Sequence, residues 1–404
     1  MRKQVVGVLG AAAALTGVAH AEEADSIGAA IEGGKLILEA RPRVERLDQA
    51  GVAEADAYTL RTRLGWETAS WNGLTGLIEF EDVRDLGGDY NDGVPPAEPY
   101  ASIPDPEGTE LNRLQLSWRA NEHFTGTLGR QTIEFDDKRF VDASNSRQDA
   151  RTLDALRGDI RFGGFQATYA YVDHVNNTTA EFADWESESH LFNASQTFSP
   201  ALKLTGFVYA LDFETPAAIN QSSRFAGVRA SGRVEAAGAR FDYAASFANQ
   251  TDYGNSTLSF DLDYWQASVV ARRGEWSTRV WYESLEGNGA LGFFVPIGSN
   301  NNFHGWAGAF STKPANGLND FNVTLSYAPE WAPDVLEDLT FMARWYEFET
   351  ERTGLDLGNE LDLSVSADLT EQLSFAVEYG DYNAGDPGSP APRTRTRLML
   401  MYKL

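Results

Sequence analysis

From Lys35 to its end, the chain repeats one unit, a stretch of alternating polarity of about ten residues followed by a break. The last twelve residues, RTRTRLMLMYKL, place Leu398, Leu400, Tyr402 and Leu404 at every second position. Successive side chains of a β-strand point to opposite faces, so this period predicts strands with one apolar and one polar face. The stretches YTLRTRLGWE (58–67), FNVTLSY (321–327) and LSFAVEY (373–379) have the same pattern.

The breaks between these stretches alternate in length. Short breaks lie at 70–73, 120–123, 163–164 and 199–200, and long ones at 84–110, 133–152, 176–188 and 287–317. A β-sandwich would also have alternating strands. Tight turns on one rim and long loops on the other are typical of a membrane barrel, with the turns periplasmic and the loops extracellular.

We predict an all-β protein, a transmembrane antiparallel up-and-down β-barrel of about 18 strands, with short periplasmic turns and long extracellular loops. An even number of strands places both termini at the periplasmic rim, and a barrel of this size encloses an aqueous channel. The predicted strands begin near Lys35, Tyr58, Leu74, Leu111, Phe124, Leu153, Phe165, His190, Leu202, Arg224, Ala239, Leu258, Trp276, Asp320, Leu339, Leu361, Leu373 and Arg393.

The N-terminus has the features of a secretory signal. Arg2 and Lys3 precede an apolar run at 5–18 and the small-residue exit AHA, which predicts cleavage before Glu22. The apolar run is shorter than the roughly 20 residues that a membrane-spanning helix needs. We therefore expect a signal peptide at residues 1–21, export to the cell outer membrane, and a barrel formed by residues 22–404.

Composition limits the partners and the means of stabilisation. The chain has no cysteine, so disulfides cannot hold it together. Its net charge of −26 argues against a nucleic-acid partner. The expected partners are instead outer-membrane lipid and lipopolysaccharide, a small anionic or saccharide solute, and the barrel assembly machinery. The assembly machinery is expected because the C-terminal strand resembles an assembly signal, with Leu404 in place of the usual phenylalanine.

Arginine is far more common than lysine, and many arginines lie on the polar face of the predicted strands. Closure of the barrel places the last strand beside the first, which predicts an arginine wall from those strands and the second one. Guanidinium groups suit carboxylate or phosphate ligands. The predicted pore-lining residues are Arg41, Arg43, Arg61, Arg63, Arg113, Arg130, Arg139, Arg157, Arg393, Arg395 and Arg397.

Two interpretations of these arginines remain open. The wall could attract an anionic solute and release it from several weak sites. Alternatively, the arginines could be satisfied by nearby acids as ion-pair ladders that maintain the shape of the barrel and keep it hydrated.

The long acidic loop at 84–110 is the predicted constriction. We expect it to fold inward and lay its carboxylates on the arginine wall, although a mobile surface loop is the alternative. The constriction residues would be Asp85, Asp89, Asp92 and Glu107. The DYNDG stretch within this loop is one residue short of a calcium-loop spacing, so no metal site is predicted.

The sequence contains no recognised catalytic constellation. It has no HExxH motif, no GxSxG elbow and no phosphate-binding loop. Asp136 and Asp137 are adjacent, so on a strand they would point to opposite faces and form a poor acid and base pair. We therefore predict neither enzymatic activity nor a cofactor, with a barrel enzyme or a non-conducting structural or adhesin barrel as the alternative.

Two segments resemble the alginate-export porin family of Gram-negative outer membranes. They are GRQTIEFDDKRFVDASNSRQDARTLDALRG (129–158) and FFVPIGSNNNFHGWAGAFSTKPANGLND (293–320), the second with His304, Gly305 and Trp306 at its core. The resemblance implies an 18-stranded monomeric channel for anionic or neutral polysaccharides or related small solutes, with inward loops. It also implies that Arg130 and Arg139 line the pore or anchor a loop, and that Trp306 anchors the long loop.

Together, these features predict a passive porin for anionic or polyhydroxylated solutes such as uronic-acid-containing saccharides. The departures from the family pattern are a lumen of mixed charge and the lack of a long periplasmic loop near the late turns.

Overall fold

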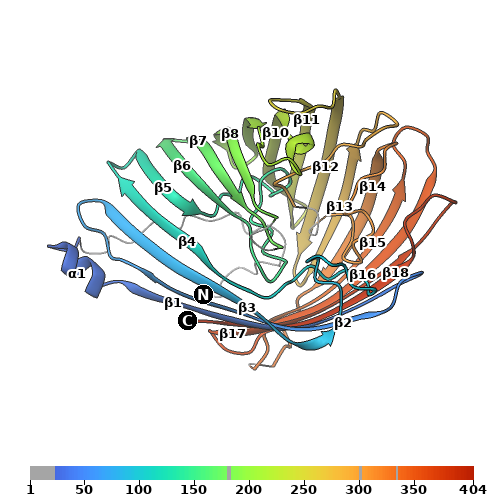
Figure 1. Ribbon diagram of the computed structural model, residues 1–404, viewed down its shortest axis with the longest axis horizontal. Helices are drawn as coiled ribbons and strands as arrows, with labels where there is room; N and C mark the ends of the chain where they lie inside the picture. The colour runs from blue at the N-terminus through green and yellow to red at the C-terminus, as the bar shows by residue number, and fades with distance from the viewer. Residues whose placement is uncertain (1–22, 180–182, 300–302, 334) are drawn as a thin grey trace.

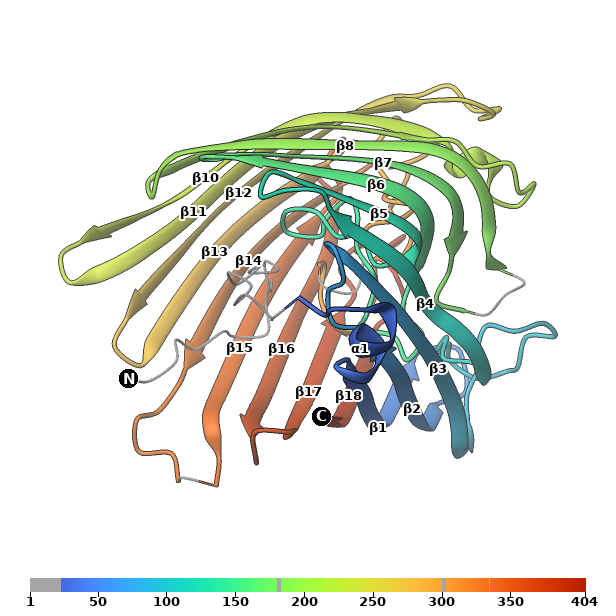
Figure 2. The same cartoon turned by 90° about the vertical axis from the view of Figure 1, so that its left-hand side faces the viewer.

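The computed structural model describes residues 23–179, 183–299, 303–333 and 335–404. The predicted signal peptide, residues 1–21, lies outside the described residues. Within them, 18 antiparallel strands form a single sheet in which the last strand pairs with the first, so the predicted barrel is confirmed (Figures 1 and 2). Among the described residues, no helix combines the length and the apolar character needed to cross a membrane.

The strands are β1 (Lys35–Gln49), β2 (Ala55–Glu67), β3 (Leu74–Asp89), β4 (Gly108–Arg119), β5 (Phe124–Gln131), β6 (Thr152–Phe162), β7 (Phe165–Asn176), β8 (Trp185–Ser199), β9 (Leu202–Leu211), β10 (Ser223–Ala236), β11 (Ala239–Asp252), β12 (Asp261–Arg273), β13 (Trp276–Leu285), β14 (Leu318–Tyr327), β15 (Glu337–Glu349), β16 (Asp356–Asp368), β17 (Leu373–Asn383) and β18 (Arg393–Lys403). Each pairs with its neighbours in sequence. Helical elements among the described residues include α1 (Ile27–Glu32) and the short η2 (Ile219–Gln221).

The two faces of β18 explain the alternation of the C-terminal sequence. Leu398 and Leu400 are 46% and 38% exposed on the outside of the barrel, whereas Arg395 and Arg397 are 7% and 5% exposed inside it. Leu398 lies beside Val44 of β1 and Val377 of β17, which are also exposed. The exposed apolar row therefore continues across the closure of the barrel, as a lipid-facing belt requires.

Short turns and long loops occupy opposite rims, as predicted. The long loops that matter for the interior are loop 90–107, loop 132–151 and loop 286–317. The expected loop at 84–110 is shorter in the structure, because β3 continues to Asp89 and β4 begins at Gly108. The alternation in this segment was obscured by the glycines at 87 and 88, which continue the pairing with β2 beyond a bulge.

Helix α1 lies at the short-turn rim, close to the C-terminus (Figure 2). Ser26 caps it by accepting a hydrogen bond from the backbone N–H of Ala29 at 3.1 Å. The indole of Trp66, on β2, donates to the carbonyl of Ile31 at 3.0 Å. The contact with Trp66 fixes α1 beside the turn between β2 and β3.

Loops 132–151 and 286–317 fold into the lumen and pack on the wall of the barrel (Figure 1). The ring of Phe140 contacts Tyr264 of β12, with centroids 5.1 Å apart, and Phe293 of the other loop at 6.2 Å. The loops also bond to each other, since Asp142 N donates to the carbonyl of Ile297 at 2.9 Å. One side of the lumen is therefore filled by an aromatic core, which leaves the opposite side for the polar wall.

Because one face of each strand contacts lipid, a charged substitution should cost much more stability on that face than at the neighbouring position on the inner face. Val269 is 46% exposed on the outer face near the middle of β12, and Ser268 points to the inner face. We expect Val269→Arg to lower the free energy of unfolding by about 2–4 kcal/mol, because it places a charge in lipid. The matched change Ser268→Arg should cost much less. Denaturant titration of the protein in lipid vesicles measures both, and equal costs would contradict the assigned faces.

Candidate functional site

The arginine wall is an array of guanidinium groups on three neighbouring strands. Its members are Arg41 and Arg43 on β1, Arg61 and Arg63 on β2, and Arg393, Arg395 and Arg397 on β18. Pairing of β1 with both β2 and β18 brings them together, and Arg41 lies directly opposite Arg61. All except Arg63 and Arg393, which are half-buried, are at most 7% exposed.

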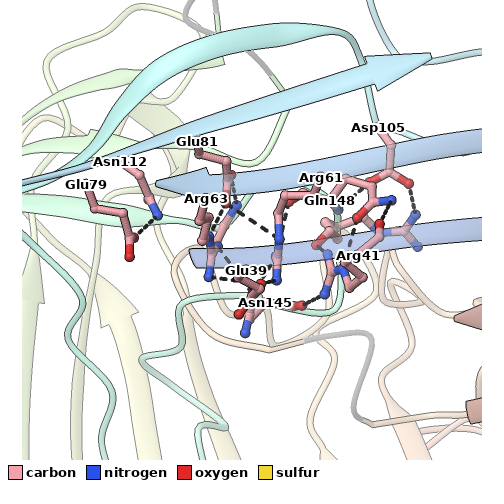
Figure 3. A network of polar contacts seen from close by, with 12 residues as sticks. Glu39, Arg41, Arg61, Arg63, Glu79, Glu81, Asp105, Asn112, Asn145 and Gln148 are labelled. Atoms are coloured by element: carbon pink, nitrogen blue, oxygen red, sulfur yellow. Dashed lines mark hydrogen bonds and ion pairs between the residues drawn. The ribbon is translucent and has the colours of Figure 1, made fainter. Parts of the chain in front are cut away.

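Carboxylates of the same strands and their neighbours pair with this wall. Glu45 forms ion pairs with Arg43 at 3.3 Å and with Arg395 at 3.2 Å. Glu81 of β3 lies between Arg61 and Arg63 and is paired with both (Figure 3). The wall is therefore a ladder of alternating charge rather than a purely basic surface, which satisfies charges that would otherwise be costly to bury.

Loop 132–151 docks onto the wall through its polar residues. Arg41 donates to Gln148 Oε1 at 2.9 Å and to the carbonyl of Asn145 at 2.7 Å. Arg61 donates to Asn145 Oδ1 at 2.7 Å, and Arg43 donates to the carbonyl of Ser146 at 3.0 Å. Because several guanidinium N–H groups bind the loop, the wall acts as its anchor as well as lining the lumen (Figure 3).

Loop 90–107 reaches the same place through Asp105, which is 1% exposed. This carboxylate forms an ion pair with Arg43 and lies 3.5 Å from Arg147. It also accepts a hydrogen bond from the backbone N–H of Gln148 at 2.7 Å. Asp105 thus joins two loops to the wall.

The four carboxylates expected to form the constriction are not the ones that bind the wall. Asp85, Asp89 and Glu107 are exposed, and Asp85 and Asp89 belong to β3. Asp92 is half-buried and accepts a hydrogen bond from the backbone N–H of Val94 at 2.8 Å. Within loop 90–107, the buried positions are taken by apolar residues such as Ala101 and Ile103, and by Asp105.

A second junction joins loops 132–151 and 286–317 through Arg139, which is 1% exposed. Arg139 donates to Glu283 of β13 at 2.7 Å and to the carbonyl of Ser299 at 2.8 Å. It also donates to His304 Nε2 at 3.0 Å, which leaves the proton of a neutral imidazole on Nδ1, where it binds Asp320 at 2.9 Å. Burial and the charge of Lys313 hold the pKa of His304 well below its usual value, consistent with the neutral ring.

Trp306 lies within loop 286–317 and is held against the strands of the barrel. Its backbone N–H donates to Asp362 Oδ1 of β16 at 3.2 Å, and its ring lies 5.5 Å from the guanidinium carbon of Arg344. The neighbouring Ala307 N–H donates to Glu360 at 2.7 Å. Loop 286–317 is therefore fixed to β15 and β16 as well as to β13.

The other predicted arginines lie along β4 to β6 and are half-buried. Arg113 pairs with Glu79, Arg130 with Asp154 at 2.8 Å, and Arg157 with Asp159 at 2.8 Å. They continue the charged surface around the lumen from the wall. Arg393 donates instead to the carbonyl of Gly308 at 3.3 Å, at the edge of loop 286–317.

Sequence reasoning missed the loop residues that complete the site. Asn145, Gln148 and Asp105 bind the wall, and Glu283 and His304 bind Arg139. The available signal was that Arg139 and His304 lie in the two segments that carry the family resemblance. The structure shows that these two segments meet.

The fold and the site define a membrane β-barrel channel of the porin type. The family model described as alginate export matches residues 35–272, more than half of the chain, and the chain belongs to the alginate export family.

Solved structures of bacterial porins have the same fold. Pseudomonas aeruginosa OccK1 (OpdK) superposes with a TM-score of 0.73 at 12% sequence identity, over 93% of this chain and 99% of that chain. Acinetobacter baumannii OccAB2 gives 0.73 at 15% identity, with the same coverage of each chain. Pseudomonas aeruginosa OccK9 (OpdG) gives 0.73 at 15% identity, again over 93% and 99%. No curated protein matches the chain in sequence.

Removal of the main anchor should widen the channel. Each hydrogen bond from a charged donor contributes about 1.5–3 kcal/mol, and Arg41 makes several to loop 132–151. We expect Arg41→Ala to release the loop from the wall and to increase single-channel conductance in planar bilayers. The control is Arg46→Ala, which removes an exposed arginine of the same strand. Unchanged conductance in Arg41→Ala would contradict an anchoring role.

Asp142, in loop 132–151, should make the free energy of unfolding depend on pH. Burial, with the charge of Glu134, raises the pKa of Asp142 to about 6. The folded state therefore binds this proton more tightly than the unfolded chain, so the free energy of unfolding falls as pH rises from about 4 to 6, by roughly 3 kcal/mol, and then levels off.

Asp142→Asn should remove this part of the pH slope, measured by denaturant titration between pH 4 and 7. Asp89→Asn, an exposed carboxylate, should retain it. An identical slope in Asp142→Asn and wild type would rule out Asp142 as its source.

Proposed function

We propose that this chain is a passive outer-membrane channel whose lumen favours anionic or polyhydroxylated solutes, such as saccharides that contain uronic acids. The observation that carries the proposal is the arginine wall, onto which loops 132–151 and 90–107 dock inside the barrel. Its half-buried members, Arg63 and Arg393, are the most accessible to a solute, and guanidinium groups suit carboxylates and hydroxyl oxygens as ligands.

The pairing of the wall supports transport by exchange of partners. Arg63 and Arg397 each have a carboxylate partner, Glu81 and Glu378 respectively, and each retains some solvent exposure. A carboxylate of the solute could bind Arg63 or Arg397 transiently as an additional partner, while Glu81 and Glu378 stay in place. Several such sites of moderate strength allow a solute to bind and leave, as conduction requires.

The comparisons support the same class of solute. The family is described as alginate export. One of the structurally similar porins, Pseudomonas aeruginosa OpdK, has been solved with vanillate. Both a uronic-acid polymer and vanillate present carboxylate and hydroxyl oxygens, which an array of guanidinium, amide and carboxylate groups can bind.

In this proposal, the long-loop rim faces the exterior and the short-turn rim faces the periplasm, as in bacterial barrels with both termini inside. The apolar belt contacts outer-membrane lipid, lipopolysaccharide surrounds the long-loop side, and the chain acts as a monomer after cleavage of residues 1–21. The lumen carries the solute passively, without a cofactor.

Reversal potentials across planar bilayers in a salt gradient test the proposal. We expect wild type to prefer anions, because the wall concentrates them. The triple variant Arg61→Gln, Arg63→Gln and Arg395→Gln should lose this preference several-fold, and uronic-acid oligomers should block wild type more strongly than the variant.

The control variant changes three exposed arginines, Arg46, Arg84 and Arg233, to glutamine, which alters the net charge equally but leaves the wall intact. It should retain the preference of wild type. Cation preference in wild type, or an equal effect of both triples, would exclude the anion-binding role of the wall and support a purely structural ladder.

A further inference from the structure

The geometry points to a calcium site between the barrel and loop 132–151. It is formed by Glu81 of β3, Glu110 of β4 and Asp149 of the loop. Glu81 and Glu110 lie opposite each other in the pairing of β3 with β4. Loop 132–151 brings Asp149 onto them from inside the lumen. The inference goes beyond the transport proposal and does not depend on which solute passes.

The spacing of the three carboxylates fits one ion. One oxygen from each of them lies within 4.8 Å of the others. Calcium binds oxygen at 2.3–2.6 Å, so two oxygens bound to the same calcium ion can be at most about 5 Å apart. The three oxygens can therefore bind one ion without movement of the backbone.

An unsatisfied atom points independently to a missing ligand. Asp149 is 7% exposed, and its buried Oδ1 has no hydrogen-bond partner among the described residues. Neither Asp149 nor Glu110 forms an ion pair with a cationic side chain within the part of the chain that the structure describes. Among the side chains that the structure describes, the carboxyl of Asp149 has only the acidic groups of Glu81 and Glu110 as hydrogen-bond partners, and a bound dication would offset the repulsion among the three groups.

The third carboxylate is already fixed in position. Glu81 is 1% exposed, pairs with Arg63, and accepts a hydrogen bond from the backbone N–H of Ala150 at 3.2 Å. Because Ala150 directly follows Asp149, this hydrogen bond also holds Asp149 close to Glu81. Glu81 therefore provides a rigid ligand, beside Arg63 in Figure 3. Three ionised carboxylates and one guanidinium group carry a net charge of about −2, which a bound dication would balance.

A second cluster of three potential metal ligands differs in that it has a cationic side chain as a partner. Glu283, His304 and Asp320 also bring three ligand atoms within 4.8 Å. There, however, Arg139 donates to both Glu283 and His304, and the imidazole binds Asp320. The protein supplies the cation itself, so that cluster needs no ion.

The ligand set selects the metal. All three groups are carboxylates, which suit a hard cation, and there is no sulfur and no imidazole to favour zinc or copper. Calcium accepts six to eight oxygens in irregular geometry, whereas magnesium demands a compact octahedron. Glu110 is only half-buried, which leaves room for water ligands. The site is distinct from the DYNDG stretch of loop 90–107.

A calcium ion here would hold loop 132–151 to β3 and β4, next to its anchors on Arg41 and Arg61. The position of the constriction would then depend on the concentration of divalent cations outside the cell. Chelation would weaken the docking of the loop without altering the barrel itself.

Calorimetric titration of the detergent-solubilised mature protein with CaCl₂, after treatment with EGTA, tests the site together with the thermal unfolding temperature. We expect saturable binding of one high-affinity ion and a rise in Tm with calcium, since a ligand of the folded state stabilises it. Glu110→Gln should weaken binding at least tenfold and abolish the rise. Without calcium, this variant should have a Tm equal to or above that of wild type, because it relieves the repulsion from Asp149.

The matched control is Glu98→Gln, the same chemical change at an exposed position of loop 90–107, which should bind calcium as wild type does. Asp149→Asn provides the second ligand variant if Glu110→Gln does not fold. No calcium binding in wild type at millimolar concentration, or undiminished binding in the ligand variants, would overturn the site. Equal affinity for MgCl₂ would overturn the assignment to calcium.

Discussion

The pairing of β18 with β1 is the contact on which the other features depend. In lipid, an unpaired sheet edge would leave a row of backbone N–H and C=O groups without partners, and closure removes that cost. The same contact gathers the arginines of β1 and β18 on the inside. The arginine wall therefore results from closure, and a barrel that failed to close there would lose its candidate site together with its stability.

The inside of the barrel has two chemically different halves. On one side, Phe140 of loop 132–151 and Phe293 of loop 286–317 pack against aromatic residues of the barrel strands. Exclusion of water stabilises this packing. On the other side, the same loop 132–151 offers its carbonyls and Gln148 to guanidinium groups. One loop thus joins an apolar core to a charged surface, which explains why its sequence mixes buried aromatics with Asn, Gln and Asp.

The alternation of polarity was sufficient to predict the strands because each one is exposed to lipid on one side and to the polar interior on the other. Predicted starts at Leu74, Phe124, Phe165, Leu202 and Leu373 coincide with the observed ones. The predicted end of β3 was wrong, because the strand continues to Asp89 through Gly87 and Gly88, where no apolar row marks it. The gathering of arginines on β1, β2 and β18 also followed from sequence, since closure alone places those strands together.

The loop contacts could not be predicted in the same way. No period relates Asp105 or His304 to the strand residues that they bind, and the choice of Asp105 over the exposed Asp85 and Glu107 depends on which apolar residues of loop 90–107 are buried. Buried polar contacts of this kind are set by the tertiary packing of the loops. Composition indicated an acidic loop, but it could not indicate which carboxylate turns inward.

The two sets of contacts on loop 132–151 have a mechanical consequence. Arg139 holds one part of the loop to β13, and Arg41 and Arg61 hold another part to the wall. Loss of either set leaves the other in place, so the loop would pivot about the surviving attachment instead of leaving the lumen. The aperture would then change in discrete steps, each corresponding to one broken attachment, while the surrounding sheet keeps its diameter.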